Sequence, residues 1–137
     1  MSAAKMLSLS MALSFALASA AAVAAKPLER VTSNAGSVTV AVQPVDLSPS
    51  AKSWDFDVTL STHVSPLEQD LTKVSVLVDP SGAQHAPTAW KGDPPGGHHR
   101  KGVLEFAPVS GSPAYVQLQI KGVGTTPEVR TFRWQLR

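Results

Sequence analysis

The stretch Trp54-Asp-Phe-Asp-Val-Thr-Leu60 alternates apolar and polar residues without a break. Its apolar side chains would point to one side of an extended chain, and Asp55, Asp57 and Thr59 to the other, because successive residues of a strand face opposite ways. Such alternation is typical of a strand with one face against a core and the other in water. The stretch therefore predicts a strand of a two-layered β protein.

Six other runs have extended-chain patterns and are separated by segments that hold most of the prolines and glycines. They are residues 37–43, 73–79, 83–90, 102–107, 114–121 and 129–136. Asp79-Pro80-Ser81-Gly82 has the residues preferred in a type I turn and predicts a hairpin into residues 83–90. The only helix expected is a single turn near residues 66–71. About seven short strands predict an all-β, immunoglobulin-like antiparallel β-sandwich.

The length of 137 residues fits one such domain over residues 37–137, preceded by a flexible leader over residues 26–36. The expected core follows the apolar phase of the strands and contains Trp54, Phe56, Val58, Val76, Leu118, Phe132 and Trp134. Trp90 is assigned to the same core, at the base of the loop that follows it. The chain has no cysteine, so packing alone must stabilise the fold.

Residues 1–25 have the order of a secretory signal peptide: Lys5, an apolar run, then small residues. Val23 and Ala25 occupy the small-residue positions before a cut, which would leave Lys26 as the new N-terminus. The apolar run is too short and too often interrupted by serine to span a bilayer. We therefore expect a periplasmic or secreted protein with no membrane span after processing.

Charge and composition exclude several classes of function. The chain has 12 Lys and Arg against 10 Asp and Glu, and loss of Lys5 with the signal peptide reduces this small excess further. Binding of nucleic acid is not expected, because phosphate contacts need clustered positive charge. No phosphate-binding loop or nucleophile elbow is present, and isolated serines give no hydrolase triad. An enzyme is therefore not expected.

The most unusual segment is Trp90-Lys-Gly-Asp-Pro-Pro-Gly-Gly-His-His-Arg-Lys-Gly-Val-Leu-Glu-Phe106. Its prolines stiffen one half of a loop and its glycines free the other, so His98 and His99 are expected at a loop tip. His63 follows the Trp54–Leu60 strand, whereas His85 is expected on a strand surface. Two adjacent residues of an extended chain point to opposite sides, so adjacency alone gives no chelating pair.

The segment from residue 54 to residue 106 resembles a family of small exported bacterial β-sandwich domains of no assigned function. The resemblance lies in Thr62-His63, in Pro66-Leu67-x-x-Asp70-Leu71 and in the loop motif Trp-x-Gly-Asp-Pro-Pro-Gly-Gly-His-His-Arg-x-Gly-Val-Leu-x-Phe. His63, His98, His99 and Arg100 match the motif, and His85 lies outside it. The resemblance implies an exported β-sandwich and no particular activity.

Two functions fit these residues. The first is a non-enzymatic binding module that presents a loop to a protein or cell-envelope partner, with Trp90, Asp93, His98, His99 and Arg100 in the loop. The second is a periplasmic metal-binding protein, because imidazoles of His63, His98 and His99 are suitable ligands for copper or zinc. The second function requires the three imidazoles to converge on one point.

Overall fold

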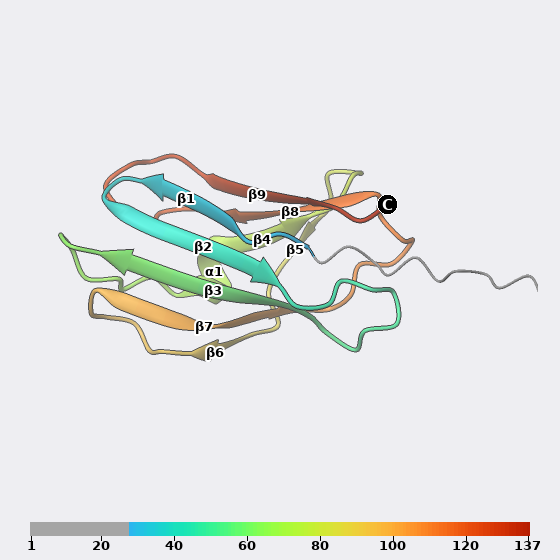
Figure 1. Cartoon of the computed structure of the whole chain (residues 1–137), viewed down its shortest axis with the longest axis horizontal. Coiled ribbons are helices and arrows are strands. Elements are labelled where there is room, and N and C mark those ends of the chain that lie inside the picture. The colour runs from blue at the N-terminus through green and yellow to red at the C-terminus, as the bar shows by residue number, and fades with distance from the viewer. Residues whose placement is uncertain (1–27) are drawn as a thin grey trace, which may run out of the picture.

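A computed structural model describes residues 28–137 as two antiparallel sheets packed face to face (Figure 1). One sheet has the strand order β1-β2-β3-β7-β6 and the other the order β5-β4-β8-β9. The strands of this part of the chain are β1 (Val31–Ala35), β2 (Val38–Pro44), β3 (Trp54–Thr62), β4 (Ser75–Val78), β5 (Gln84–His85), β6 (Ala89–Gly92), β7 (His99–Phe106), β8 (Tyr115–Ile120) and β9 (Arg130–Gln135). The predicted all-β sandwich is confirmed, with nine strands in residues 28–137 in place of about seven.

Strand β3 lies in the middle of the larger sheet, between β2 and β7. Its register with β7 runs from the pair Trp54 and Phe106 to the pair Ser61 and His99. The apolar residues of the opening stretch are all buried, as the alternation predicts. Strand β3 therefore runs from the aromatic pair Trp54 and Phe106 at one end of the sandwich to His99 at the other end.

Aromatic rings from both sheets meet in the core. The ring of Phe56 lies 5.6 Å from that of Phe106, nearly perpendicular to it, and 5.4 Å from that of Trp134. Trp134 in turn stacks on Phe132 at 6.5 Å. Edge-to-face and offset contacts of this kind add to the stabilisation from buried apolar area.

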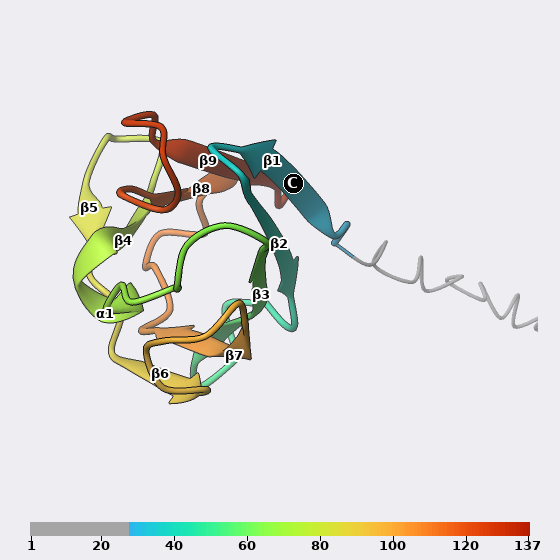
Figure 2. The same cartoon turned by 90° about the vertical axis from the view of Figure 1, so that its left-hand side faces the viewer.

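Strand β1 was expected to lie within a flexible leader, and this expectation is wrong for residues 31–35. β1 pairs with β2, and its other edge faces β9 across the gap between the sheets (Figure 2). Side chains of β9 bridge this gap: Arg130 donates to the carbonyls of Ser33 (3.0 Å) and Ala35, and Trp134 donates to that of Glu29 (2.7 Å). The sequence of β1 is polar because it lies at a sheet edge.

The run 73–79 was predicted to be one continuous strand with Val76 in the core. Instead, a short helix α1 (Leu71–Val74) precedes β4, with the Asp70 side chain accepting a hydrogen bond from Thr72 N at its start. The helix shifts the phase of the strand, so that Ser75 and Leu77 are buried and Val76 is only half-buried. The core predictions for Trp54, Phe56, Val58, Leu118, Phe132 and Trp134 are confirmed, whereas Trp90 on β6 is only partly buried against the core.

The run 83–90 is also divided. The turn at residues 79–82 leads into β5, which pairs with β4 over only two residues. The chain then crosses to the other sheet and forms β6 beside β7. Figure 2 shows α1 between β4 and β6, and α1 contacts β6.

The predicted signal peptide, residues 1–25, lies outside the residues that the structure describes. Among residues 28–137, no helix is long and apolar enough to span a membrane.

Candidate functional site

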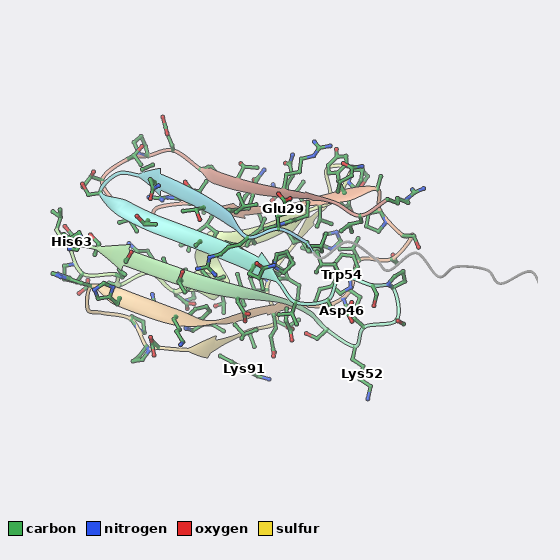
Figure 3. All side chains as sticks on the ribbon, in the orientation of Figure 1. Glu29, Asp46, Lys52, Trp54, His63 and Lys91 are labelled. Atoms are coloured by element: carbon green, nitrogen blue, oxygen red, sulfur yellow. The ribbon has the colours of Figure 1, made fainter. Side chains whose placement is uncertain are left out.

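Two segments far apart in the sequence meet at one end of the sandwich. They are residues 63–67, which follow β3, and residues 93–99, which lead into β7. Backbone hydrogen bonds join them: Thr62 N to His98 O (2.9 Å), Leu67 N to Gly97 O (2.8 Å) and Gly96 N to Leu67 O (2.7 Å). We call the surface of these two segments the histidine ledge. Figure 3 shows His63 at this end, opposite the end that holds Trp54, Asp46 and Lys52.

The turn of the ledge needs glycine at two positions. Gly96 and Gly97 have φ angles of 113° and 70°, which residues with a side chain rarely adopt. Asp93 closes the turn from within, because its backbone N donates to Lys101 O (3.0 Å) and its carboxylate accepts from Lys101 N (2.9 Å). The Pro-Pro-Gly-Gly sequence therefore fixes the shape of the turn and does not make it flexible.

Arg100 is buried beneath the ledge, with 1% of its surface exposed. Its guanidinium donates to the carbonyl of Gln69 at 2.7 Å and to those of Leu67 and Asp93 at 3.3 Å. Burial lowers the pKa of Arg100, and the charges of Asp93 and Asp70 offset part of this effect. The guanidinium remains charged, because the ordinary pKa of arginine lies far above neutrality. Arg100 thus joins both segments of the ledge to β7.

Arg100 does not belong to the exposed loop surface, contrary to the sequence prediction. Strand β7 begins at His99, and Arg100 shares the inward phase of Leu104 and Phe106. Extending this alternation backward from Phe106 would have placed Arg100 inside. Sequence reasoning also missed the acceptors Leu67 and Gln69, because backbone carbonyls have no signature in a sequence.

Trp90 lies at the base of the ledge, half-buried at the sheet edge. Its indole covers the cross-strand pair of Gly92 and Gly102, where an added Cβ atom would lie 2.9 or 2.8 Å from the indole ring. The indole N–H donates to Asp93 O at 2.9 Å, and the Arg100 guanidinium carbon lies 5.6 Å from the ring centre. The two glycines therefore provide the space in which Trp90 supports the turn.

The three histidines of the ledge are all exposed, as is Val64, which has 62% of its surface accessible. His99 pairs with Ser61, whose side chain points away from the core, and His98 precedes β7 in a bend of the chain. The ledge presents imidazoles and one valine to solvent on a hydrogen-bonded support.

The predicted three-histidine metal site does not form. Within residues 28–137, no three His, Asp or Glu side chains lie close enough together to hold a metal ion. The three imidazoles extend from different parts of the backbone, because His63 follows the end of β3, His98 lies in the bend before β7 and His99 begins β7. The proposal of copper or zinc ligation by His63, His98 and His99 is therefore corrected.

His85 lies apart from the ledge and pairs with Asp79, its Nε2 at 2.9 Å from the carboxylate. Hydrogen bonds from the Ser81 hydroxyl, then from His85, lower the pKa of Asp79 from 3.8 to about 2. The Asp79 carboxylate also accepts from Ser81 N and Ala83 N, which closes the turn between β4 and β5. The role of His85 at this position is structural, as expected for a residue on a strand surface.

Two hollows lie at opposite ends of the sandwich. A small one of about 70 Å³ adjoins the ledge, between the β1–β2 turn and residues 62–67. A larger, mainly apolar one of about 720 Å³ is lined by Leu28, by the loop 45–49, by Trp54, by residues 112–113 and by the C-terminal residues 135–137. Leu28, the first residue that the structure describes, lies in the wall of the larger hollow.

No protein-family model and no curated protein matches this chain. Among solved structures, the chain is similar to a secreted protein from Mycobacterium tuberculosis, MPT63. The two share 15% sequence identity with a TM-score of 0.42, over 82% of this chain and 99% of that one.

Proposed function

We propose that the protein is an exported, non-enzymatic binding module that contacts a protein or cell-envelope partner through the histidine ledge. Export is supported by the charge, apolar run and small residues of positions 1–25. The observation on which the binding function rests is the buried guanidinium of Arg100 beneath exposed imidazoles.

Burial of a charged group costs free energy, and the hydrogen bonds from Arg100 to loop carbonyls recover part of that cost. The result is a loop pair with a defined shape, although its outward side chains contribute little to the core. His63, Val64 and His99 are presented on this support, and all three are exposed. Imidazoles beside an exposed valine can provide both hydrogen bonds and apolar contact to a partner. A preordered loop also loses less conformational entropy on binding.

Site-specific photo-crosslinking in the producing cells tests this proposal. A photoreactive amino acid replaces His63 or His99, and in the control it replaces Lys52 at the opposite end of the sandwich (Figure 3). We expect a crosslinked species of discrete mass from both ledge positions and none from position 52. The same species from all three positions, or none from the ledge, would contradict the proposal.

A double variant tests whether the ledge side chains contact the partner without being needed for the stability of the fold. His98→Ala with His99→Ala should abolish the crosslink formed from position 63, while the urea unfolding curve changes little, because exposed side chains contribute little to stability. Loss of several kcal/mol in that curve would instead show that the histidines stabilise the fold.

A further inference from the structure

Two peptide bonds of the chain join aspartate to proline, Asp79–Pro80 and Asp93–Pro94. A carboxyl group is a nucleophile, and that of an aspartate can reach its own main-chain carbonyl carbon by closing a five-membered ring. Because proline has no N–H, its nitrogen cannot attack the same carboxyl group and form a cyclic imide instead. At an Asp-Pro bond, the reaction open to the carboxyl group is therefore the one that breaks the chain.

Two donors lie on the carbonyl oxygen of Asp93. The indole N–H of Trp90 donates to it at 2.9 Å, and the guanidinium of Arg100 donates to it at 3.3 Å. Arg100 is 1% exposed, so its positive charge acts where water screens it little. Fixed donors stabilise the negative charge that a carbonyl oxygen gains when a nucleophile adds to its carbon, and long contacts of this kind shorten as the charge develops. The two donors thus form an oxyanion hole at Asp93 O.

The carboxyl group of Asp93 is positioned by Lys101 and is free on one side. Asp93 N donates to Lys101 O at 3.0 Å, and Asp93 Oδ2 accepts from Lys101 N at 2.9 Å. Among residues 28–137, Lys101 N is the only hydrogen-bond donor to this carboxylate, which leaves Oδ1 available for reaction. Asp93 and Pro94 are both exposed, so water can reach the bond between them.

We propose that the protein cleaves its own peptide bond between Asp93 and Pro94. A carboxyl oxygen of Asp93 adds to the carbonyl carbon of the same residue, the C–N bond to Pro94 breaks, and the carboxyl proton passes to the Pro94 nitrogen. A cyclic anhydride remains at Asp93, and water opens it to two carboxyl groups. The balance is the consumption of one water molecule, and each chain reacts once. This inference goes beyond the proposed binding function and does not depend on it.

Both new ends remain attached to the sandwich after the cut. The strand before it, β6, pairs with β7, and after it Gly96 N donates to Leu67 O at 2.7 Å. The new α-carboxylate of Asp93 gives Arg100 an anionic acceptor in place of a neutral carbonyl, and such charge-assisted hydrogen bonds are the stronger kind. Cleavage therefore opens the turn of the ledge without separating the two parts, and it gives the buried guanidinium a direct ionic partner.

The bond Asp79–Pro80 is an internal control of the same composition. Asp79 O accepts from Gly82 N at 2.9 Å, which is a neutral main-chain donor. The Asp79 carboxylate accepts from Ser81 and pairs with His85, and these hydrogen bonds lower the pKa of Asp79 to about 2. This carboxyl group stays ionised in mild acid and lacks the proton that the leaving nitrogen needs. We therefore expect slower cleavage at Asp79–Pro80 than at Asp93–Pro94.

Incubation of the purified full chain in mildly acidic buffer tests the proposal, because ordinary aspartic acid side chains are partly protonated there. Mass spectrometry of samples unfolded at successive times gives the rate of cleavage at each bond, from fragments whose masses sum to that of the chain plus one water molecule. The same incubation in concentrated urea removes the surroundings of both bonds. Three variants complete the set: Arg100→Met removes the cationic donor, Trp90→Phe the indole donor, and Asp93→Ala the nucleophile.

In the folded protein we expect cleavage at Asp93–Pro94 to be at least about tenfold faster than at Asp79–Pro80, and the ratio to fall to about one in urea. Arg100→Met should slow cleavage at Asp93–Pro94 about tenfold, and Trp90→Phe by less, while the rate at Asp79–Pro80 stays that of the wild type. Asp93→Ala should abolish the cut. A ratio near one in the folded protein, an equal ratio in urea, or the wild-type rate in Arg100→Met would overturn the inference.

Discussion

Replacement of Arg100 by methionine tests whether the buried guanidinium supports the histidine ledge. Methionine keeps most of the volume of the side chain and removes its donors. Of the three carbonyls that Arg100 contacts, Leu67 O keeps the bond from Gly96 N and Asp93 O keeps the bond from the Trp90 indole. Gln69 O, at 2.7 Å, is the acceptor that has no second donor among residues 28–137.

The expected loss of unfolding free energy comes mainly from the carbonyl of Gln69. A hydrogen bond from a charged donor contributes about 1.5–3 kcal/mol, and the two longer bonds contribute less because their carbonyls keep other donors. The substitution also removes the free-energy cost of burying a charge, which offsets part of the loss. We therefore expect Arg100→Met to lower the free energy of unfolding by about 2 kcal/mol, and Arg100→Ala by about 3–5 kcal/mol, because alanine also leaves a cavity.

Urea denaturation followed by tryptophan fluorescence measures both values. Arg133→Met serves as the control, since Arg133 lies on an exposed face, above the ring of Tyr115 at 3.7 Å, and should cost less than about 1 kcal/mol. Hydrogen exchange at Leu67 N and Gly96 N should accelerate in Arg100→Met more than exchange in β8. A change below about 0.5 kcal/mol for Arg100→Met would refute the reasoning and assign the rigidity of the ledge to its backbone bonds alone.

Three further predictions concern the core, the glycine pair and pH. Phe56→Ala should cost about 3–5 kcal/mol in urea denaturation, because Phe56 is fully buried between Phe106 and Trp134; a cost below about 1 kcal/mol would contradict this packing. Gly102→Ala should cost about 1–3 kcal/mol in the same assay, because its Cβ would lie 2.5 Å from Gly92 Cα; no loss would mean that the strands separate freely there. The pKa of Asp79 is lowered to about 2, so its contribution to the free energy of unfolding is present above the ordinary pKa of 3.8 and is lost as pH falls toward 2. The difference in unfolding free energy between wild type and Asp79→Asn should therefore shrink between pH 3.8 and pH 2. A difference that stays constant over this range would contradict the pairing of Asp79 with Ser81 and His85.

The sequence predicted those parts of the fold that depend on local alternation. Trp54–Leu60 and the runs that became β8 and β9 each bury one face, and a period of two identifies that face without other information. Prediction failed where a distant residue determines the structure. Strand β1 is polar and edge-lying, and Arg130, 95 residues after Ala35 in the sequence, holds its end.

The same limit applies to the ledge. The position of His63 at the end of a strand and the turn at residues 93–97 follow from residue types, and the structure brings both together. The burial of Arg100 did not follow, because a charged residue after two histidines was assigned to the loop and not to the strand. Two of its three acceptors, Leu67 O and Gln69 O, lie 33 and 31 residues earlier in the sequence, and the pairing of β3 with β7 brings that segment close.

Arg100 and Arg130 both donate hydrogen bonds to buried loop carbonyls near the first residues of a strand. Each is an inward-facing residue at the start of a strand, β7 or β9, and each is at least 97% buried. Loop carbonyls near such positions are shielded from water and need donors. Arginine offers five donors and no acceptor, so a single side chain can satisfy several carbonyls at once. Arg130 donates to Val38 O (2.7 Å) and Val123 O (3.1 Å) in addition to the β1 carbonyls. The acceptors of Arg130 are neutral carbonyls and no acidic group contributes to its pKa, whereas the charges of Asp93 and Asp70 favour the charged form of Arg100. The β1–β2 turn, which Arg130 holds, should therefore keep its shape over a wide range of pH, whereas the ledge also depends on the Asp93 carboxylate that accepts from Lys101 N.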